Sequence, residues 1–309
     1  MFRELRVMPI KGPSFDRRER RERICGMRIF MAYDPIREGR TSAGWGVQNL
    51  DYFLPPAFAL VSMGLESLRT LGPPRDHGAM PDKSSRPKVI ANFAISWDGK
   101  ISSYLGSPSN FSSPEDKQRL IRIRSEGDAV LVSGRTVAAD SMTMGIPDAT
   151  LRDERVARGQ AEYPLRVVVS ASGNLNPELR VFRARFSTLI VFTSDRMPTS
   201  VREALRDSCT LVIAPAADRL DLGWVLRTLK SDHGVSTLVV EGGGELLRGF
   251  LNEGLLDEIC LTVCPLVFGS SEAVSLVGAL PPYLGQSAKL SLISAEKIGD
   301  ELFTRWRCL

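Results

Sequence analysis

The chain has 309 residues, of which 43% are apolar and 25% are charged, the composition of an ordinary globular protein. Its net charge of +4 and its pI of about 8.9 are too mild to indicate nucleic acid as a partner. No apolar run reaches the roughly 18–20 residues that span a bilayer, and no signal-peptide pattern opens the chain. We therefore expect a cytoplasmic protein that binds neither nucleic acid nor a membrane.

The five cysteines are scattered along the chain and odd in number. Cys260 and Cys264 lie two strand periods apart, so in a strand their side chains face the same side. This pattern predicts small core residues in a reducing compartment rather than a disulfide or a zinc site. We expect no bound metal.

The chain divides near Arg86. Residues 1–85 show no sustained strand or helix pattern, and residues 74–87 have the composition of a linker. Acids interrupt the arginine-rich run at 16–23, which favours a solvated or frayed helix over a nucleic-acid contact or a targeting presequence. The sequence thus predicts an N-terminal extension, residues 1–85, followed by one domain, residues 86–309.

From Val89 onward, apolar strand-like runs alternate with helical segments, which predicts an α/β fold with a mostly parallel sheet covered on both faces. The last two strands, joined through Gly299-Asp300, predict an antiparallel hairpin. The expected strands are Val89–Ser96, Ala129–Ser133, Leu165–Ser170, Ser187–Thr193, Thr210–Ala214, Thr237–Val240, Glu258–Cys264, Lys289–Glu296 and Glu301–Cys308.

Three helix starts are marked by local residue types. Ser113 is an N-cap followed by Pro114 at the first helical position. Asp221 is an N-cap for a helix at Leu222–Ser231. A third helix opens at Pro198-Thr199 and runs through Leu205.

The segment from Thr237 to Gly269 is the most informative part of the chain. Its first strand ends in Glu241 and three glycines, and a helical segment follows at once. The free N–H groups of a helix N-terminus and the helix dipole attract phosphate, and glycine lets a ligand approach the backbone. The alternative is that Gly242–Gly244 only form a tight turn between strand and helix.

Polar residues follow other strands of the predicted sheet. Ser96–Lys100 follows the first strand and Gly134–Thr136 the second, with Asp140 one helical turn beyond Thr136, and Ser170–Ser172 ends the third. Because parallel strands end at the same edge, we expect these residues to form one site. Each of these segments alone is weak evidence for a site, since Asp-Gly is a common turn and Gly-Arg-Thr can simply cap a helix.

Three segments carry a family resemblance: Ile95–Ile101, Arg122–Asp140 and Val239–Gly269. They resemble the reductase domain of the bifunctional riboflavin-biosynthesis deaminase/reductase, a member of the dihydrofolate-reductase-like superfamily. The resemblance covers about residues 86–309. It implies a three-layer α/β/α sandwich, a homodimer, and reduction of 5-amino-6-(5-phosphoribosylamino)uracil by NADPH, with hydride passing to C1′ of the ribosyl group to give a ribityl chain.

The resemblance also assigns residues to the cofactor. It places two residues of the first strand near the nicotinamide and the glycine-rich turn against the phosphates. The expected NADPH contacts are Ala94, Ser96, Arg135, Thr136, Asp140, Gly243, Gly244, Glu245 and Leu246. For Arg135 the alternative is a solvent-exposed arginine at a helix start.

On the substrate side, the resemblance implies that Arg124 and Glu241 hold the substrate and that Lys100 faces its ribose phosphate. Asp140, close to the reacting ribose, and Lys100 are the expected catalytic residues. Asp140 has the alternative of capping a helix, and Lys100 that of a solvated lysine after a turn. Glu241 needs a partner in any case, since a carboxylate that ends an apolar strand is costly to bury alone.

The chain departs from the family pattern on the substrate side. Pro108 stands where a serine contacts substrate, Asn110 begins the segment that is Trp-Ile-Thr in the family, and Ile146 aligns near the arginine that grips the substrate phosphate. Arg152 or Arg155 is a candidate replacement for that arginine. If neither serves, the substrate lacks a phosphate or differs altogether.

Residues 1–85 contain one histidine and one cysteine, in neither of the arrangements that hold a deaminase zinc. The leading hypothesis is therefore a stand-alone reductase of the riboflavin pathway. The alternatives are a reductase of the same fold with another pyrimidine, pterin or carbonyl substrate, and a catalytically silent paralogue that binds nucleotide.

Overall fold

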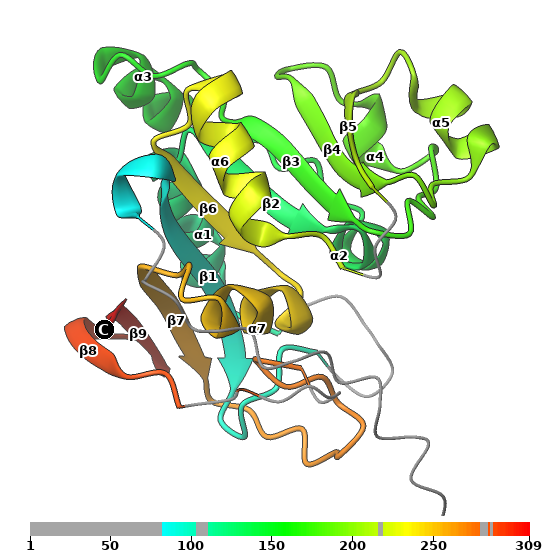
Figure 1. The fold of residues 1–309 in the computed structure, drawn as a ribbon. Helices are drawn as coiled ribbons and strands as arrows, with labels where there is room; N and C mark the ends of the chain where they lie inside the picture. The colour runs from blue at the N-terminus through cyan, green and yellow to red at the C-terminus, as the bar shows by residue number, and fades with distance from the viewer. Residues whose placement is uncertain (1–81, 103–110, 216–218, 279–283, 285–286) are drawn as a thin grey trace, which may run out of the picture. The chain divides into compact units, whose positions relative to one another are not determined.

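In the part of the chain that the structure describes, nine strands form one sheet in the order β5-β4-β3-β2-β6-β1-β7-β9-β8 (Figure 1). The computed structural model describes residues 82–102, 111–215, 219–278, 284 and 287–309. The strands are β1 Lys88–Ser96, β2 Ala129–Ser133, β3 Leu165–Ser170, β4 Leu189–Ser194, β5 Thr210–Ala214, β6 Thr237–Glu241, β7 Glu258–Cys264, β8 Leu290–Ile298 and β9 Glu301–Cys308. The first seven pair in parallel, and β9 pairs antiparallel with both β7 and β8. The predicted sheet and its C-terminal hairpin are confirmed.

Helices cover both faces of the sheet, which gives the three layers that were expected. The helices are α1 Pro114–Glu126, α2 Gly134–Asp140, α3 Ala149–Ala157, α4 Arg180–Arg183, α5 Thr199–Leu205, α6 Leu222–His233 and α7 Gly244–Asn252, preceded by a 3-10 turn, η1, at Lys83–Ser85. Leu226 of α6 and Phe250 of α7 belong to the apolar core on one face. Ile123 of α1, Val137 of α2 and Phe182 of α4 belong to the core on the other. None of these helices is long and apolar enough to cross a membrane.

Two of the three predicted helix starts are confirmed by side-chain caps, and the third helix, α5, begins at Thr199 as predicted but without a side-chain cap. Ser113 accepts a hydrogen bond from the Asp116 N–H at 3.1 Å, and Asp221 accepts one from the Trp224 N–H at 3.0 Å. Helix α6 runs two residues further than predicted and ends at Gly234, whose φ of 65° suits glycine.

Four predicted strands differ from the structure at their ends: β1 begins one residue earlier, at Lys88, β6 ends one residue later, at Glu241, and two others are displaced. The strand expected at Ser187–Thr193 occupies Leu189–Ser194, and the one expected at Lys289–Glu296 occupies Leu290–Ile298. Such shifts of one or two residues are usual, because the apolar pattern indicates the body of a strand better than its ends.

The cysteines of β7 are core residues, as predicted. Cys260 and Cys264 are 1% and 0% exposed, and both are free thiols. Burial raises the pKa of the Cys260 thiol, because the surrounding apolar side chains disfavour the thiolate. A thiol held in its neutral form is a poor nucleophile, which fits a packing role.

The described residues of the predicted domain begin at a buried ion pair. Arg86, 4% exposed, donates to both carboxylate oxygens of Asp257 at 2.6 and 3.0 Å, and Asp257 also accepts from the Val89 N–H at 2.8 Å. The predicted extension lies outside the described residues except for 82–85. The domain boundary therefore stays a prediction.

A buried arginine joins α3 to the end of α1. Arg155 is 1% exposed, and its guanidinium donates to the carbonyl oxygens of Ala161, Ser125 and Gly127 at 3.0, 2.8 and 2.6 Å. The last carbonyls of a helix have no partners within the helix. Arg155 supplies hydrogen-bond donors to two carbonyls at the end of α1, those of Ser125 and Gly127. It thereby fixes α3 at the edge of the sheet where β2 begins.

We predict that Arg155→Met lowers the free energy of unfolding by about 3 kcal/mol, because the carbonyl oxygens of Ser125, Gly127 and Ala161 each lose a hydrogen bond from this buried guanidinium. Urea denaturation followed by circular dichroism measures the change. Arg158→Met is the matched control, since the half-exposed Arg158 also donates to Ser125 O, at 3.0 Å. Equal losses in the two variants would contradict this role for Arg155.

Candidate functional site

The carboxyl ends of β2, β6 and β1 meet at one edge of the sheet, where the arrowheads of Figure 1 point the same way. Because β6 pairs with both β2 and β1, the segments that follow these three strands are neighbours. They carry Gly134–Thr136, Glu241–Gly244 and Ser96–Lys100. The sequence prediction that these residues lie at one edge is confirmed.

The turns after β2 and β6 are in direct contact. A Cβ atom on Gly242 would lie 2.4 Å from Thr136 Cγ2, and one on Gly243 would lie 3.0 Å from Ser133 Oγ. The φ angles of the two glycines are 83° and 93°, which side chains also disfavour. The turn after β6 is consequently bare backbone, tightly packed against the start of α2.

Helix α7 begins without a side-chain cap. Its N-cap is Gly243, whereas the other described helices of eight or more residues are capped by Ser113, Asp148 and Asp221. The first N–H groups of α7 therefore lack a side-chain acceptor. Together with the positive end of the helix dipole, they suit an anionic ligand.

The turn after β1 is held by the carboxylate of Asp98. Asp98 accepts from the Ser96 hydroxyl at 2.7 Å and from the N–H groups of Phe268 and Gly269 at 3.1 and 2.9 Å. The hydrogen bond from Ser96, followed by those from Gly269 and Phe268, lowers the pKa of Asp98 to about 2. The sequence indicated only an Asp-Gly turn here. The structure shows that this turn anchors the segment after β7.

A short segment connects Lys100 to the start of α7. Lys100 forms an isolated antiparallel bridge with Ser275, and the Ile101 N–H donates to Val274 O at 2.8 Å. A Cβ atom on Gly244 would lie 2.7 Å from both Ser275 O and Gly278 N. Residues 274–278 thus link two of the predicted site segments. Sequence reasoning missed them, because they carry no regular periodicity.

Arg124 and Glu241 form a buried, bidentate ion pair. The Arg124 Nε and Nη2 atoms donate to the two carboxylate oxygens of Glu241 at 2.8 and 2.6 Å, and Nη1 donates to Gly145 O at 2.6 Å. The two residues are 5% and 3% exposed. The partner that Glu241 was expected to need is therefore Arg124, and the substrate contacts expected of both residues stay predictions.

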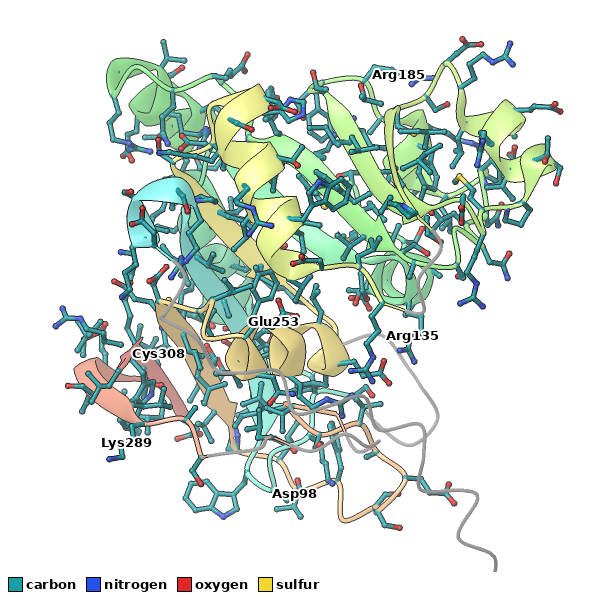
Figure 2. All side chains as sticks on the ribbon, viewed as in Figure 1. Asp98, Arg135, Arg185, Glu253, Lys289 and Cys308 are labelled. Atoms are coloured by element: carbon teal, nitrogen blue, oxygen red, sulfur yellow. The ribbon has the colours of Figure 1, made fainter. Side chains whose placement is uncertain are left out.

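Arg135 and Glu245 connect the starts of α2 and α7. The Arg135 guanidinium donates to Glu245 Oε2, and the two side chains are 78% and 37% exposed. Figure 2 shows Arg135 beside α7, with Arg185 at the opposite edge of the sheet. The alternative of an exposed arginine at a helix start describes the environment of Arg135, but it does not account for its carboxylate partner.

Asp140 is the last residue of α2, and Ser141 follows in a left-handed conformation. The alternative that Asp140 caps a helix is wrong, because Ser133 caps α2 and Asp148 caps α3. A helix C-terminus disfavours negative charge. Asp140 therefore caps neither α2 nor α3.

The remaining cofactor contacts that were expected are partly buried. Ala94 lies two residues before the end of β1, and Leu246 lies in the first turn of α7. The structure places both on the elements that form the site edge.

Of the three positions at which the chain departs from the family pattern on the substrate side, the structure describes one, Ile146. Pro108 and Asn110 lie outside the described residues, and Ile146 is 1% exposed. Arg152 donates to Ile146 O and Pro147 O at 3.1 and 2.8 Å and to Glu162 at 2.9 Å. The expectation that Arg155 replaces the phosphate-binding arginine is wrong, because Arg155 is buried at the opposite edge of the sheet. The guanidinium of Arg152, the other candidate, is bound within its own segment.

A surface hollow of about 680 Å³ lies at that opposite edge. Ser125, Asp128 and Thr237 are among the residues that line it, and Asp128 and Thr237 stand at the starts of β2 and β6. It contains none of the predicted site residues. This hollow has the volume of a small-molecule pocket. The glycine turn and the uncapped helix favour the carboxyl edge instead, which we take as the candidate site.

Comparison with protein families gives a match over residues 87–304, to the RibD C-terminal domain. The 2,5-diamino-6-ribosylamino-4(3H)-pyrimidinone 5′-phosphate reductase of Methanothermobacter thermautotrophicus is 33% identical over 222 residues, which are 72% of this chain and 98% of that protein. The enzyme of the same name from Archaeoglobus fulgidus is 32% identical over 61% of this chain and 84% of its own length.

Among solved structures, a pyrimidine reductase-like protein from Corynebacterium diphtheriae superposes with a TM-score of 0.63 at 18% identity. The match covers 74% of this chain and 94% of that one. At this identity the likeness concerns the fold alone.

We predict that Asp98 holds the segment after β7 only in its ionised form. Because its pKa is lowered from 3.8 to about 2, the stabilisation is complete above pH 3.8 and is lost as the pH falls toward 2. Amide hydrogen exchange, corrected for its intrinsic pH dependence, measures this at Phe268 and Gly269. Both amides should lose protection in that window, and Asp98→Asn should remove the pH dependence.

The Leu266 amide serves as the internal control, since it donates to Cys264 O at 2.8 Å and not to Asp98. Identical pH profiles for Leu266 and Gly269 would contradict the role of Asp98.

Proposed function

The chain belongs to the RibD C-terminal domain family of riboflavin-biosynthesis reductases, and we propose that it reduces the ribosyl group of a ribosylaminopyrimidine 5′-phosphate with NADPH. The observation that carries the proposal is the bare glycine turn after β6, which leads into the uncapped start of α7. The choice of NADPH is part of the proposal, because the family implies a nicotinamide cofactor without specifying which one.

The residues at the site edge fit a dinucleotide. The turn at Gly242 and Gly243 carries no side chain that would screen the start of α7, and the first turn of α7 offers N–H groups to phosphate oxygens. Arg135 adds an exposed guanidinium beside them, whose planar fork matches phosphate geometry. A bound nicotinamide cofactor supplies the hydride.

The protein's own task is then mainly to position the cofactor and the substrate and to exclude water. The Ser96 hydroxyl is held within the turn after β1, where it donates to Asp98 and accepts from the Lys100 N–H at 3.0 Å. We therefore assign the nicotinamide contact to the backbone of Ala94 and Ser96 rather than to the hydroxyl. Asp140 is proposed to hold the ribose hydroxyls, and Lys100 to face the ribose phosphate.

Two pyrimidines are candidate substrates. The relatives at 33% and 32% identity are named for 2,5-diamino-6-ribosylamino-4(3H)-pyrimidinone 5′-phosphate, and the match spans nearly all of the first. The resemblance in the sequence implies the deaminated compound, 5-amino-6-(5-phosphoribosylamino)uracil. We place the diamino compound first, because those relatives match this chain over most of their own length.

The test is an assay of the purified full chain with each pyrimidine and with NADPH or NADH, in which the ribityl product is followed by chromatography. We expect NADPH-dependent turnover of the diaminopyrimidinone. NADPH binding without turnover of either pyrimidine would instead favour a reductase of the same fold with another substrate, or the silent paralogue that binds nucleotide. Absence of NADPH binding would contradict the proposed function.

Asp140→Ala should lower kcat about 100-fold in this assay, the usual range for losing a group that handles protons or orients hydroxyls. Asp153→Ala, an exposed change on α3, is the control and should leave turnover unchanged. Unchanged turnover in Asp140→Ala would refute the role of Asp140.

We further propose that the chain forms a homodimer through the β8–β9 hairpin. Strand β8 is the sheet edge, and Leu290 and Leu292 are 42% and 51% exposed. They pair with Cys308 and Trp306, and Leu302 lies on the same face of β9 with 41% exposure. An apolar face on an edge strand is a liability in a lone chain. A second copy would cover it by a two-fold, isologous contact.

Leu292→Glu should convert the dimer to a monomer, which sedimentation equilibrium measures across a range of protein concentrations. Ser291→Glu is the matched control, because the adjacent residue of a strand faces the opposite side of the hairpin. A Leu292→Glu protein that remains dimeric would exclude this surface.

A further inference from the structure

The ion pair between Arg135 and Glu245 stands at the candidate phosphate site. Glu245 lies in the first turn of α7, where the proposed function places the cofactor phosphates, and Arg135 is the second residue of α2. Their helices start side by side, because a Cβ atom on Gly242 would collide with Thr136. An incoming phosphate would therefore meet a carboxylate and a guanidinium that already neutralise each other.

The two partners differ in how firmly they are held. The Arg135 side chain is 78% exposed, whereas that of Glu245 is 37% exposed and its Cγ would lie 3.3 Å from a Cβ atom on Gly278. The stem of Glu245 is thus packed against the turn at 275–278, while Arg135 projects into solvent. Of the two, Arg135 is free to swing toward another anion, and Glu245 stays in place.

The same physics that favours a phosphate at this position also favours Glu245. An acidic side chain in the first turn of a helix is stabilised by the dipole and by the free N–H groups. It consequently offsets the positive potential that the dipole and Arg135 would otherwise present to a ligand. An exposed ion pair of this kind contributes little to stability and exchanges easily.

We propose that Glu245 competes with the cofactor phosphates for Arg135, so that dinucleotide binding exchanges this ion pair and the carboxylate limits the affinity of the site. This inference rests on the proposed function. In it Glu245 weakens cofactor binding, whereas a cofactor contact would strengthen it. Glu245 repels the phosphates, and Arg135 attracts them once it is released.

The test is isothermal titration of NADPH into the full chain and its variants. Glu245→Gln keeps the shape of the side chain and removes its charge, and should tighten NADPH binding roughly fivefold, the equivalent of one exposed charge pair. Arg135→Gln should weaken binding. In the Arg135→Gln background, Glu245→Gln should have a smaller effect, because no guanidinium remains to be released.

Salt gives a second readout that a purely structural role would not alter. The Debye length, beyond which salt screens charges from each other, falls to about 3 Å at 1 M salt. The tighter NADPH binding of Glu245→Gln should therefore disappear at that salt concentration. Glu154→Gln is the matched control, since it removes the carboxylate of another exposed pair, with Arg158 at 3.8 Å, on α3 at the opposite edge of the sheet. Its Kd for NADPH should equal that of the unchanged protein.

The outcomes separate the inference from the proposed function. If NADPH binds but Glu245→Gln leaves the Kd within twofold or raises it, the competition does not occur. If NADPH binds to none of the variants, the proposed function and this inference fall together.

Discussion

The buried ion pair between Arg124 and Glu241 is the interaction on which the candidate site depends. It joins three parts of the fold: α1 through Arg124, the end of β6 through Glu241, and the segment after α2 through the carbonyl of Gly145. Removing one partner of such a pair typically costs about 3–5 kcal/mol, because the other charge stays buried and unpaired. The point at which the chain leaves β6 is thereby fixed.

From that fixed point, backbone contacts build the rest of the edge. Gly242 and Gly243 bring the turn after β6 against the start of α2, and Gly244 brings it against residues 275–278. Those residues pair with Gly99–Ile101, in the turn that Asp98 anchors. The turns after β1, β2 and β6 thus touch in series. This suits hydride transfer, where the protein's contribution is position rather than strong acid–base chemistry.

The parts of this structure that are visible in the sequence are those set by local periodicity and capping. Alternating apolar runs indicated the sheet, and Ser113 and Asp221 indicated two helix starts. Helix α3 was hidden because only Leu151 and Arg155 of its residues are buried, so it has no apolar stripe. Glu241 was expected to need a partner, but Arg124 lies 117 residues away. A sequence shows which charges exist and not which of them meet.

The same limit explains why a count of arginines gives a poor account of the site. Arg86, Arg155 and Arg166 are almost completely buried, and Arg166 serves the carbonyls of Val181, Ala184 and Ser187. Their charge maintains the architecture and does not create a positive field at the carboxyl edge. There, Arg135 is balanced by Glu245. An anionic ligand would therefore be held chiefly by backbone N–H groups and the dipole of α7, which are fixed by the fold, whereas the exposed pair is the element through which charge adjusts affinity.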